Sequence, residues 1–328
     1  MHFSRPLIVI FAFVLLAACA PTRMTVGPSV MTPELTPTGA RMGDGAWLPI
    51  RAFKAEKPKA VILALHGFND YSNAFATPGP GPWFAEHDIT LYAYDQRGFG
   101  RAPGHGHWAG EKAMVRDAAT MVRLLRARYP GLPVYVMGES MGGAVAMNLA
   151  ASPDAPKVDG FILAAPAVWG WHSMNLLYRS VLWSAAHTVP GKKLTGQGLG
   201  IMPSDNIEML RALGRDPLVI KATRISAIYG LVGLMDDAYE AAPEISAPVL
   251  YLYGANDELV PRAPTAHAVD ALATDDPTFD FRCFRNGWHM LLRDKEREVV
   301  WSDILRWIKA PKRAVSSNSA MRKSCGLL

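Results

Sequence analysis

Ser140 stands in the segment GESMG, residues 138–142, where an apolar run changes into a run of small residues with a helical pattern. A G-x-S-x-G pattern between a strand and a helix is typical of a tight turn that exposes a nucleophilic hydroxyl above a sheet. Side chains in place of the two glycines would collide with the neighbouring strand and helix. The N–H groups and the positive dipole end of the helix would point at the same place. The segment therefore predicts an exposed serine nucleophile, and a glycine-rich turn with an incidental serine is the alternative.

A serine hydroxyl becomes nucleophilic only beside a base, and the base needs an orienting carboxylate. Asp257 stands in YLYGANDELVP just past a strand-like run, where sites in open α/β sheets lie. His289 follows the last strand-like run, FRCFRNG, so we expect His289 to accept the proton of Ser140 and Asp257 to hold the imidazole. Glu258 is an alternative acid, but it should project the other way. His267 is an alternative base, but it lies in a helical pattern.

The negative charge that such a nucleophile creates must be met by hydrogen-bond donors. The segment LHGFND ends a strand-like run, and we expect the backbone N–H groups of Phe68 and Met141 to be these donors. His66 is interpreted as a buried histidine that supports the loop. His105 and His107 form an H-x-H pair without a third ligand at a sensible spacing, which indicates a loop near the cleft. The predicted chemistry requires no metal and no organic cofactor.

Short apolar runs alternate with longer helical patterns from Lys59 onward. Met114–Leu125 show the i, i+3, i+4 spacing of a helix on one sheet face, and apolar residues at 300–308 mark a closing helix. WLPIRAF, residues 47–53, predicts an antiparallel edge strand. This alternation predicts a mostly parallel α/β sheet flanked by helices, with right-handed crossovers. Five runs are nearly all apolar, as strands buried on both faces are: KAVILALHG, ITLYAYDQRG, LPVYVMGES, GFILAAPA and APVLYLYGAND.

Residues 169–242 interrupt this alternation with a segment rich in Leu, Met and Trp and mostly helical in pattern. We predict a helical cap over the strand ends, inserted between core parts 44–168 and 243–310. Apolar side chains near its start could bind substrate in an apolar groove or could form the cap's own small core. The four that we expect to bind substrate are Trp169, Trp171, Leu176 and Leu177.

The chain resembles the α/β-hydrolase group of monoacylglycerol lipases and lysophospholipases, which is classified with serine aminopeptidases. The motifs follow the family order from about residue 59 to 309: LHGFND, YDQRGFGRAPG, GESMGGAVAMNLA, LAAPAV, DPLV, GANDELVP and GWHMLL. The resemblance implies an α/β-hydrolase fold and a serine hydrolase that cleaves carboxylic esters through an acyl-enzyme. A small lipid is then the expected substrate, with its acyl chain in the apolar groove. Asp70 stands where the family has an acidic residue, two positions after Phe68, and Ala102 stands where Ser is common. Three residues of DQRG match a family turn that we interpret as structural: Asp95, Arg97 and Gly98.

Two other functions remain open on the sequence. An aminopeptidase would need an acidic cluster in the cap to hold a free amine, and four residues could supply it: Glu208, Asp236, Asp237 and Glu240. An envelope lipoprotein could instead use the fold as a non-catalytic binding scaffold. Such a protein would tolerate loss of the triad, yet all three members are present.

Residues 1–18 have a basic start, an apolar run too short for a comfortable membrane span and small residues before Cys19, as a secretory signal has. LAAC resembles the lipobox of bacterial lipoproteins, so we expect Cys19 to be acylated and to bind the membrane. A plain signal or an uncleaved anchor helix is the alternative. Ala20 after the cysteine favours the periplasmic side of the outer membrane of a bacterial cell envelope. Residues 19–43, rich in Pro and Thr, predict an extended tether.

The formal net charge is +5 over 328 residues. Without a basic stripe interleaved with aromatic residues, this excess does not indicate a nucleic-acid partner. Residues 311–328, rich in Ser, Lys and Arg, predict a loose, flexible tail. Because Cys283 lies in a strand-like run and Cys325 in this tail, we expect no structural disulfide.

Overall fold

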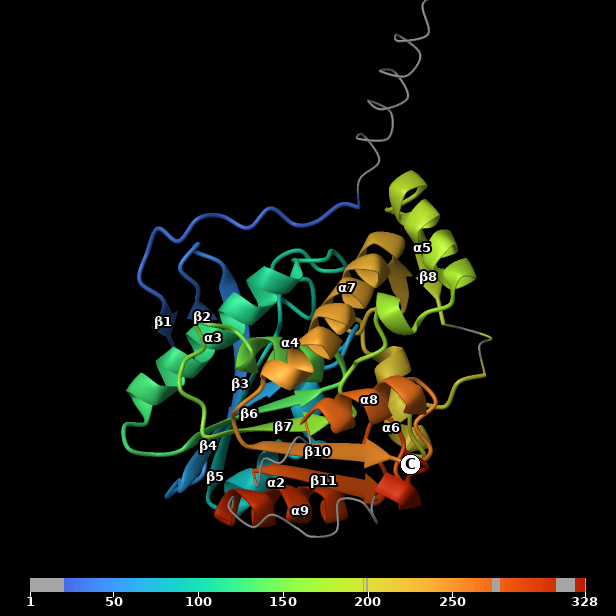
Figure 1. Ribbon diagram of the computed structural model, residues 1–328. Coiled ribbons are helices and arrows are strands. Elements are labelled where there is room, and N and C mark those ends of the chain that lie inside the picture. Colours follow the sequence, from blue (N-terminus) through green and yellow to red (C-terminus); the bar gives the residue numbers. More distant parts are fainter. Residues whose placement is uncertain (1–20, 197, 199, 273–277, 311–321, 328) are drawn as a thin grey trace, which may run out of the picture.

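The computed structural model describes residues 21–196, 198, 200–272, 278–310 and 322–327. Within them, nine strands form one sheet in the order β1-β2-β3-β5-β4-β6-β7-β10-β11 (Figure 1). The six strands from β5 to β11 in this order are mutually parallel. They are β4 (Ala60–Leu65), β5 (Ile89–Tyr94), β6 (Val134–Glu139), β7 (Gly160–Ala164), β10 (Val249–Gly254) and β11 (Phe279–Phe284). The predicted mostly parallel sheet is confirmed, and its first five parallel strands in the chain coincide with the five apolar runs.

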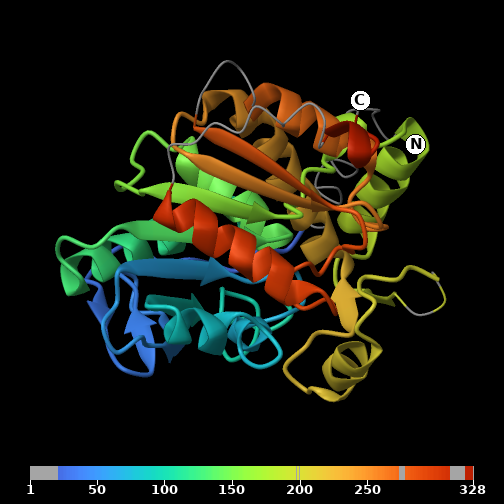
Figure 2. The ribbon, with the colours of Figure 1, turned by 90° about the horizontal axis from the view of Figure 1, so that it is seen from below.

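Helices cover both faces of the parallel strands, which explains why these strands are apolar throughout. In β4, Val61 and Leu63 pack on one face and Ile62 and Ala64 on the other. The first face carries α3 (Glu111–Arg128), α4 (Met141–Ala150) and α8 (Arg262–Leu272). The second carries η1 (Ser72–Phe75), α2 (Gly81–Glu86) and α9 (Arg297–Lys309), and Figure 2 shows α9 lying across it.

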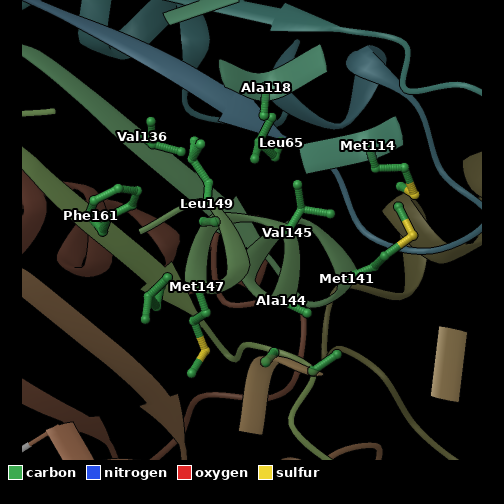
Figure 3. Close-up of a cluster of buried hydrophobic side chains, with 14 of the residues drawn as sticks. Leu65, Met114, Ala118, Val136, Met141, Ala144, Val145, Met147, Leu149 and Phe161 are labelled. Carbon is green, nitrogen blue, oxygen red and sulfur yellow. The ribbon is translucent and has the colours of Figure 1, made fainter. Parts of the chain in front are cut away.

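Helix α4 packs on the sheet through small and apolar residues, and eight of its ten residues are buried. Figure 3 shows Met141 and Val145 of α4 beside Met114 of α3, with Leu65 of β4 next to Ala118. The predicted apolar stripe of α3 is buried here. This packing fixes the first residue of α4, and therefore the turn that precedes it, against the centre of the sheet.

The N-terminal part of the sheet differs from the expectation. β3 (Trp47–Phe53) is antiparallel as predicted, but it is not an edge strand, because β2 (Gly39–Arg41) and β1 (Glu34–Leu35) continue the sheet beyond it. Residues 34–43 are therefore part of the core and not of a tether, and Ala40 and Met42 are buried. A hydrogen bond from the Thr36 N–H to the Gly39 carbonyl at 2.9 Å closes the turn between β1 and β2.

The segment between β7 and β10 forms the cap, with elements η2 (Trp171–Ser173), α5 (Leu176–Thr188), β8 (Lys193–Thr195), α6 (Ile207–Arg215), β9 (Ala222–Arg224), α7 (Ile225–Ala241) and η3 (Ala242–Glu244). β8 and β9 pair antiparallel, so the cap also holds a small sheet that its mostly helical pattern does not indicate. α7 packs on α4, and α5 packs on the outer side of α7 (Figure 1).

The C-terminal segment also differs from the expectation. Cys283 of β11 and Cys325 form a disulfide with a Cα–Cα distance of 5.9 Å, so the expectation of no disulfide is wrong. Cys325 and Leu327 are buried against the core, so the expectation of a loose tail is wrong for residues 322–327. Residues 322–324 are Arg, Lys and Ser, as that expectation assumed, but the apolar Cys325 and Leu327 that follow are buried. Across the described part of the chain, no helix has both the length and the apolar character needed to cross a membrane.

Candidate active site

The turn from β6 to α4 holds Ser140 in a backbone conformation that residues other than glycine rarely adopt. Its φ is +54° and its ψ is −116°, so the serine carries backbone strain that the surrounding structure must support. A Cβ atom at Gly138 would collide with the backbone of Gly142, and one at Gly142 would collide with the Leu65 carbonyl. Both glycines are therefore required for the close packing that the sequence predicts around Ser140.

Asp257 and His289 meet at the carboxyl edge of the sheet. Asp257 follows β10, and its Oδ2 lies 2.9 Å from Nδ1 of His289. Its Oδ1 accepts hydrogen bonds from the backbone N–H groups of Leu259 at 2.8 Å and Val260 at 3.0 Å. These bonds fix the carboxylate, which makes Nδ1 of His289 the protonated nitrogen. The tautomer leaves Nε2 free to accept a proton.

The surroundings of His289 favour its protonated form. Burial of the imidazole lowers its pKa, but the charge and hydrogen bond of Asp257 raise it, together with the charges of Glu139 and Asp294. The net result is a pKa above the ordinary value for histidine. A histidine in this state is a stronger base than one in water.

Ser140 and His289 line the same cavity, which has a volume of about 430 Å³. This size suits a small-molecule ligand. The cap supplies most of the apolar residues in the cavity wall, among them Trp169, Leu213 of α6 and Leu231 of α7. The cavity therefore joins a polar end at Ser140 to a largely apolar interior.

Of the four residues expected to bind substrate, Trp169 alone lines this cavity. Trp171 and Leu176 line a separate hollow beside α5, and Leu176 and Leu177 are 76% and 68% exposed. The interpretation of Trp171, Leu176 and Leu177 as cavity residues is therefore wrong. Leu176 and Leu177 belong to α5, on the outer side of α7, and Trp171 of η2 packs against Tyr229 in the separate hollow.

The apolar wall comes instead from α6 and α7, which the sequence reasoning did not single out. On α7 the lining residues Ile228, Leu231, Val232 and Met235 follow i, i+3, i+4, i+7 spacing, a signal for one helix face that the sequence does contain.

The loop after β4 lies beside Ser140. A Cβ atom at Gly67 would lie 3.5 Å from the Cβ of Ser140, and Phe68 lines the cavity. Met141 is the first residue of α4. The backbone N–H groups of Phe68 and Met141, the expected donors, therefore belong to residues on two sides of the serine.

His66 is buried and has backbone partners at both ring nitrogens. Its Nε2 accepts a hydrogen bond from the Gln96 N–H at 3.0 Å, so its Nδ1 donates to the Gly67 carbonyl at 2.9 Å. Burial lowers the pKa of His66, which favours this neutral tautomer. These contacts fit the expected supporting role.

The alternative acid and base have other partners. Glu258 is exposed and accepts a hydrogen bond from the Met202 N–H at 2.7 Å. His267 of α8 stacks on Tyr239, with ring centroids 4.1 Å apart. His105 bonds through Nδ1 to the Gly100 carbonyl at 2.8 Å.

The acidic residues considered for binding an amine lie elsewhere. Among the described residues that line the cavity, none is Glu208, Asp236, Asp237 or Glu240. The ligand atoms of His172, Asp236 and Glu240 lie within 4.8 Å of one another on the cap surface. They do not face the cavity that holds Ser140.

The sequence reasoning also missed Arg293, a buried residue of the cavity wall that forms ion pairs with Asp70 and Glu139. Two features of the sequence could have pointed to it. Arg293 stands four residues after His289, and the nucleophile segment contains an acidic residue, Glu139, with which it could pair. The type of each residue was visible in the sequence, but their pairing was not.

The strand order, the strained serine between a central parallel strand and its helix, and the carboxylate and histidine after later strands define an α/β-hydrolase fold. The chain belongs to the family described as serine aminopeptidase, S33, whose model matches residues 56–296.

Several known proteins are similar to the chain over most of its length. The monoacylglycerol lipase of Mycolicibacterium smegmatis is 26% identical over 275 residues, which is 82% of this chain and 93% of the relative. The human monoglyceride lipase is 24% identical over 271 residues, which is 81% of this chain and 88% of the relative. A soluble variant of the Saccharomyces cerevisiae monoglyceride lipase, solved with a substrate analogue, superimposes with a TM-score of 0.70 at 18% identity, covering 89% of this chain and 99% of that chain. This structural likeness is one of fold.

Proposed function

We propose that this protein is a serine hydrolase that cleaves the carboxylic ester of monoacylglycerols through an acyl-enzyme. The observation that carries the proposal is the single cavity that holds Ser140 and a His289 paired with Asp257, and that continues between apolar walls. The lipase names of the similar proteins support the choice of an acyl ester.

In the proposed reaction, Ser140 Oγ attacks the ester carbonyl carbon while Nε2 of His289 takes the Oγ proton. Asp257 stabilises the imidazolium, and the N–H groups of Phe68 and Met141 stabilise the oxyanion. When the carbon–oxygen bond to the alcohol breaks, His289 returns the proton to the departing glycerol. Water, deprotonated by the same histidine, then hydrolyses the acyl-enzyme and releases the fatty acid.

The charge near Ser140 favours a neutral head group. The described charged residues of the cavity wall besides His289 are Asp70, Glu139 and Arg293, which together carry one net negative charge. A phosphate group would be repelled there, whereas the hydroxyl groups of glycerol are neutral. We therefore infer that a monoacylglycerol is a better substrate than an anionic lysophospholipid.

The test compares turnover of monooleoylglycerol, p-nitrophenyl acetate, lysophosphatidylglycerol and an aminoacyl arylamide by the wild type and by Ser140→Ala. We expect monooleoylglycerol to be hydrolysed fastest and Ser140→Ala to lose both turnover and labelling by a fluorophosphonate. Faster arylamide turnover would favour the peptidase, and a preference for acetyl esters would contradict the lipid substrate. A folded wild type with neither turnover nor labelling would indicate the non-catalytic scaffold.

We further propose that Cys19 is acylated and binds the protein to the periplasmic side of the outer membrane. Cys19 and the predicted signal, residues 1–18, lie outside the described residues, so the support comes from the LAAC segment and from the Cys283–Cys325 disulfide. Disulfides persist in oxidising compartments such as the periplasm. Incorporation of labelled palmitate that is lost in Cys19→Ser, together with fractionation of the two membranes, tests this placement.

A further inference from the structure

A buried guanidinium joins three loops of the proposed active site. Arg293, 3% exposed in its side chain, places Nη1 2.8 Å from Oδ2 of Asp70 and Nη2 3.0 Å from Oε2 of Glu139. Asp70 belongs to the loop that carries Phe68, and Glu139 immediately precedes Ser140. Arg293 follows His289 by four residues, so the three charged groups come from the oxyanion loop, the nucleophile turn and the histidine loop.

We propose that the Arg293–Asp70–Glu139 cluster positions these three loops for catalysis, with Arg293 as its positioning residue. This inference rests on the proposed hydrolase function. A planar guanidinium contacts two carboxylates through separate nitrogens at fixed angles, whereas the single ammonium nitrogen of lysine would hold them in a different geometry. Because catalysis depends on the relative placement of Ser140, the oxyanion donors and His289, an error in any one loop lowers the rate.

The burial of the cluster makes each partner necessary. The side chains of Asp70 and Glu139 are 7% and 3% exposed, so loss of the guanidinium would leave two carboxylates without compensation. Removing one member of a buried ion pair is strongly destabilising for this reason. A test of positioning must therefore separate an effect on catalysis from a general loss of stability.

The chain offers a matched control in Arg97, a second buried arginine between two carboxylates. Its Nη1 lies 2.6 Å from Oδ2 of Asp44, and its Nε lies 2.5 Å from Oδ2 of Asp117. The side chain of Arg97 is 4% exposed. Among the described residues that line the Ser140 cavity, Arg97 does not appear. Arg97→Lys therefore disturbs an equivalent buried ion-pair cluster outside the wall of the Ser140 cavity.

Glu139 supplies a second readout, because its charge also acts on His289. The charged groups around that imidazole are Asp257 after β10, Glu139 of β6, and Asp294 and Arg293 of its own loop. Glu139 raises the pKa of His289, so Glu139→Gln should lower it. Since the neutral imidazole is the active base, the acid limb of activity should then move to lower pH.

The experiment measures kcat, KM and the free energy of unfolding for wild type, Arg293→Lys and Arg97→Lys with a p-nitrophenyl ester, and the pH profile of Glu139→Gln. We expect both lysine variants to lose stability. Only Arg293→Lys should lose roughly 10²-fold in kcat at little changed KM, the size of effect that a small misplacement produces.

Equal kcat losses in the two lysine variants, an undiminished kcat in Arg293→Lys, or an unmoved acid limb in Glu139→Gln would each overturn the positioning role. If Arg293→Lys does not fold, Asp70→Asn replaces it in the same comparison, with Asp44→Asn as its control. A wild type that fails to hydrolyse the ester would instead overturn the proposed function, so the two failures are distinguishable.

Discussion

At the scale of single residues, Asp257 determines both the orientation and the basicity of His289. Its Oδ2 bonds to Nδ1, and its charge and hydrogen bond are the largest contributions that raise the pKa of the buried imidazole. Asp257→Asn should lower kcat by roughly 10⁴-fold. It should also move the acid limb of the residual activity to lower pH, because the loss of the carboxylate charge lowers the pKa of His289. Glu258→Gln, at the exposed neighbouring position, is the control, and an acid limb unchanged in Asp257→Asn would contradict this assignment.

Some residues of the site follow a local pattern in the sequence, and others do not. Ser140, Asp257 and His289 each stand within five residues of the end of a strand, so a local pattern locates each one, and the structure brings Asp257 and His289 into contact. Arg293 and its partners have no such pattern. Their pairing depends on distances between three separate loops, which residue types and spacing along the chain do not specify.

At the scale of elements, α7 provides one wall of the cavity, so a larger side chain there should shorten the acyl chain that fits. Leu231→Trp should lower kcat/KM for p-nitrophenyl laurate by roughly tenfold, the effect of losing about one methylene's worth of apolar contact. The acetyl ester should be hydrolysed as before. Leu177→Trp on the outward side of α5, where Leu177 is 68% exposed, is the matched control. Equal effects on both esters would show that α7 does not bound the chain.

The strands and the cap were predictable to different degrees for a physical reason. A strand buried on both faces is apolar at nearly every position, so the five apolar runs predicted five of the six parallel strands. In the cap, α5 and α7 are both rich in apolar residues, so the one-face spacing in α7 did not by itself indicate which of the two helices borders the cavity. The short strands β1 and β2 were missed because they extend the sheet by pairing, β2 with β3 and β1 with β2, and not by an apolar run of their own.

At the scale of the whole molecule, the disulfide fastens the C-terminal segment to the sheet. Cys283 and Cys325 are 42 residues apart, and β11 carries Cys283 at the edge of the sheet. The sequence did not predict this pairing, because nothing in the composition of residues 311–328 places Cys325 against the core. A closed loop of this length restricts the unfolded chain, which the loop-entropy account values at roughly 4 kcal/mol.

Cys283→Ser/Cys325→Ser should therefore lower the free energy of unfolding in urea by roughly 4 kcal/mol relative to the oxidised wild type. The wild type treated with dithiothreitol should show a similar loss, whereas Cys19→Ser should show none. Activity at low temperature should persist in the double variant, because Cys283 and Cys325 do not line the Ser140 cavity among the described residues. If the oxidised and reduced proteins unfolded at the same urea concentration, the C-terminal segment would stay docked by packing alone, through Leu327 and its apolar neighbours.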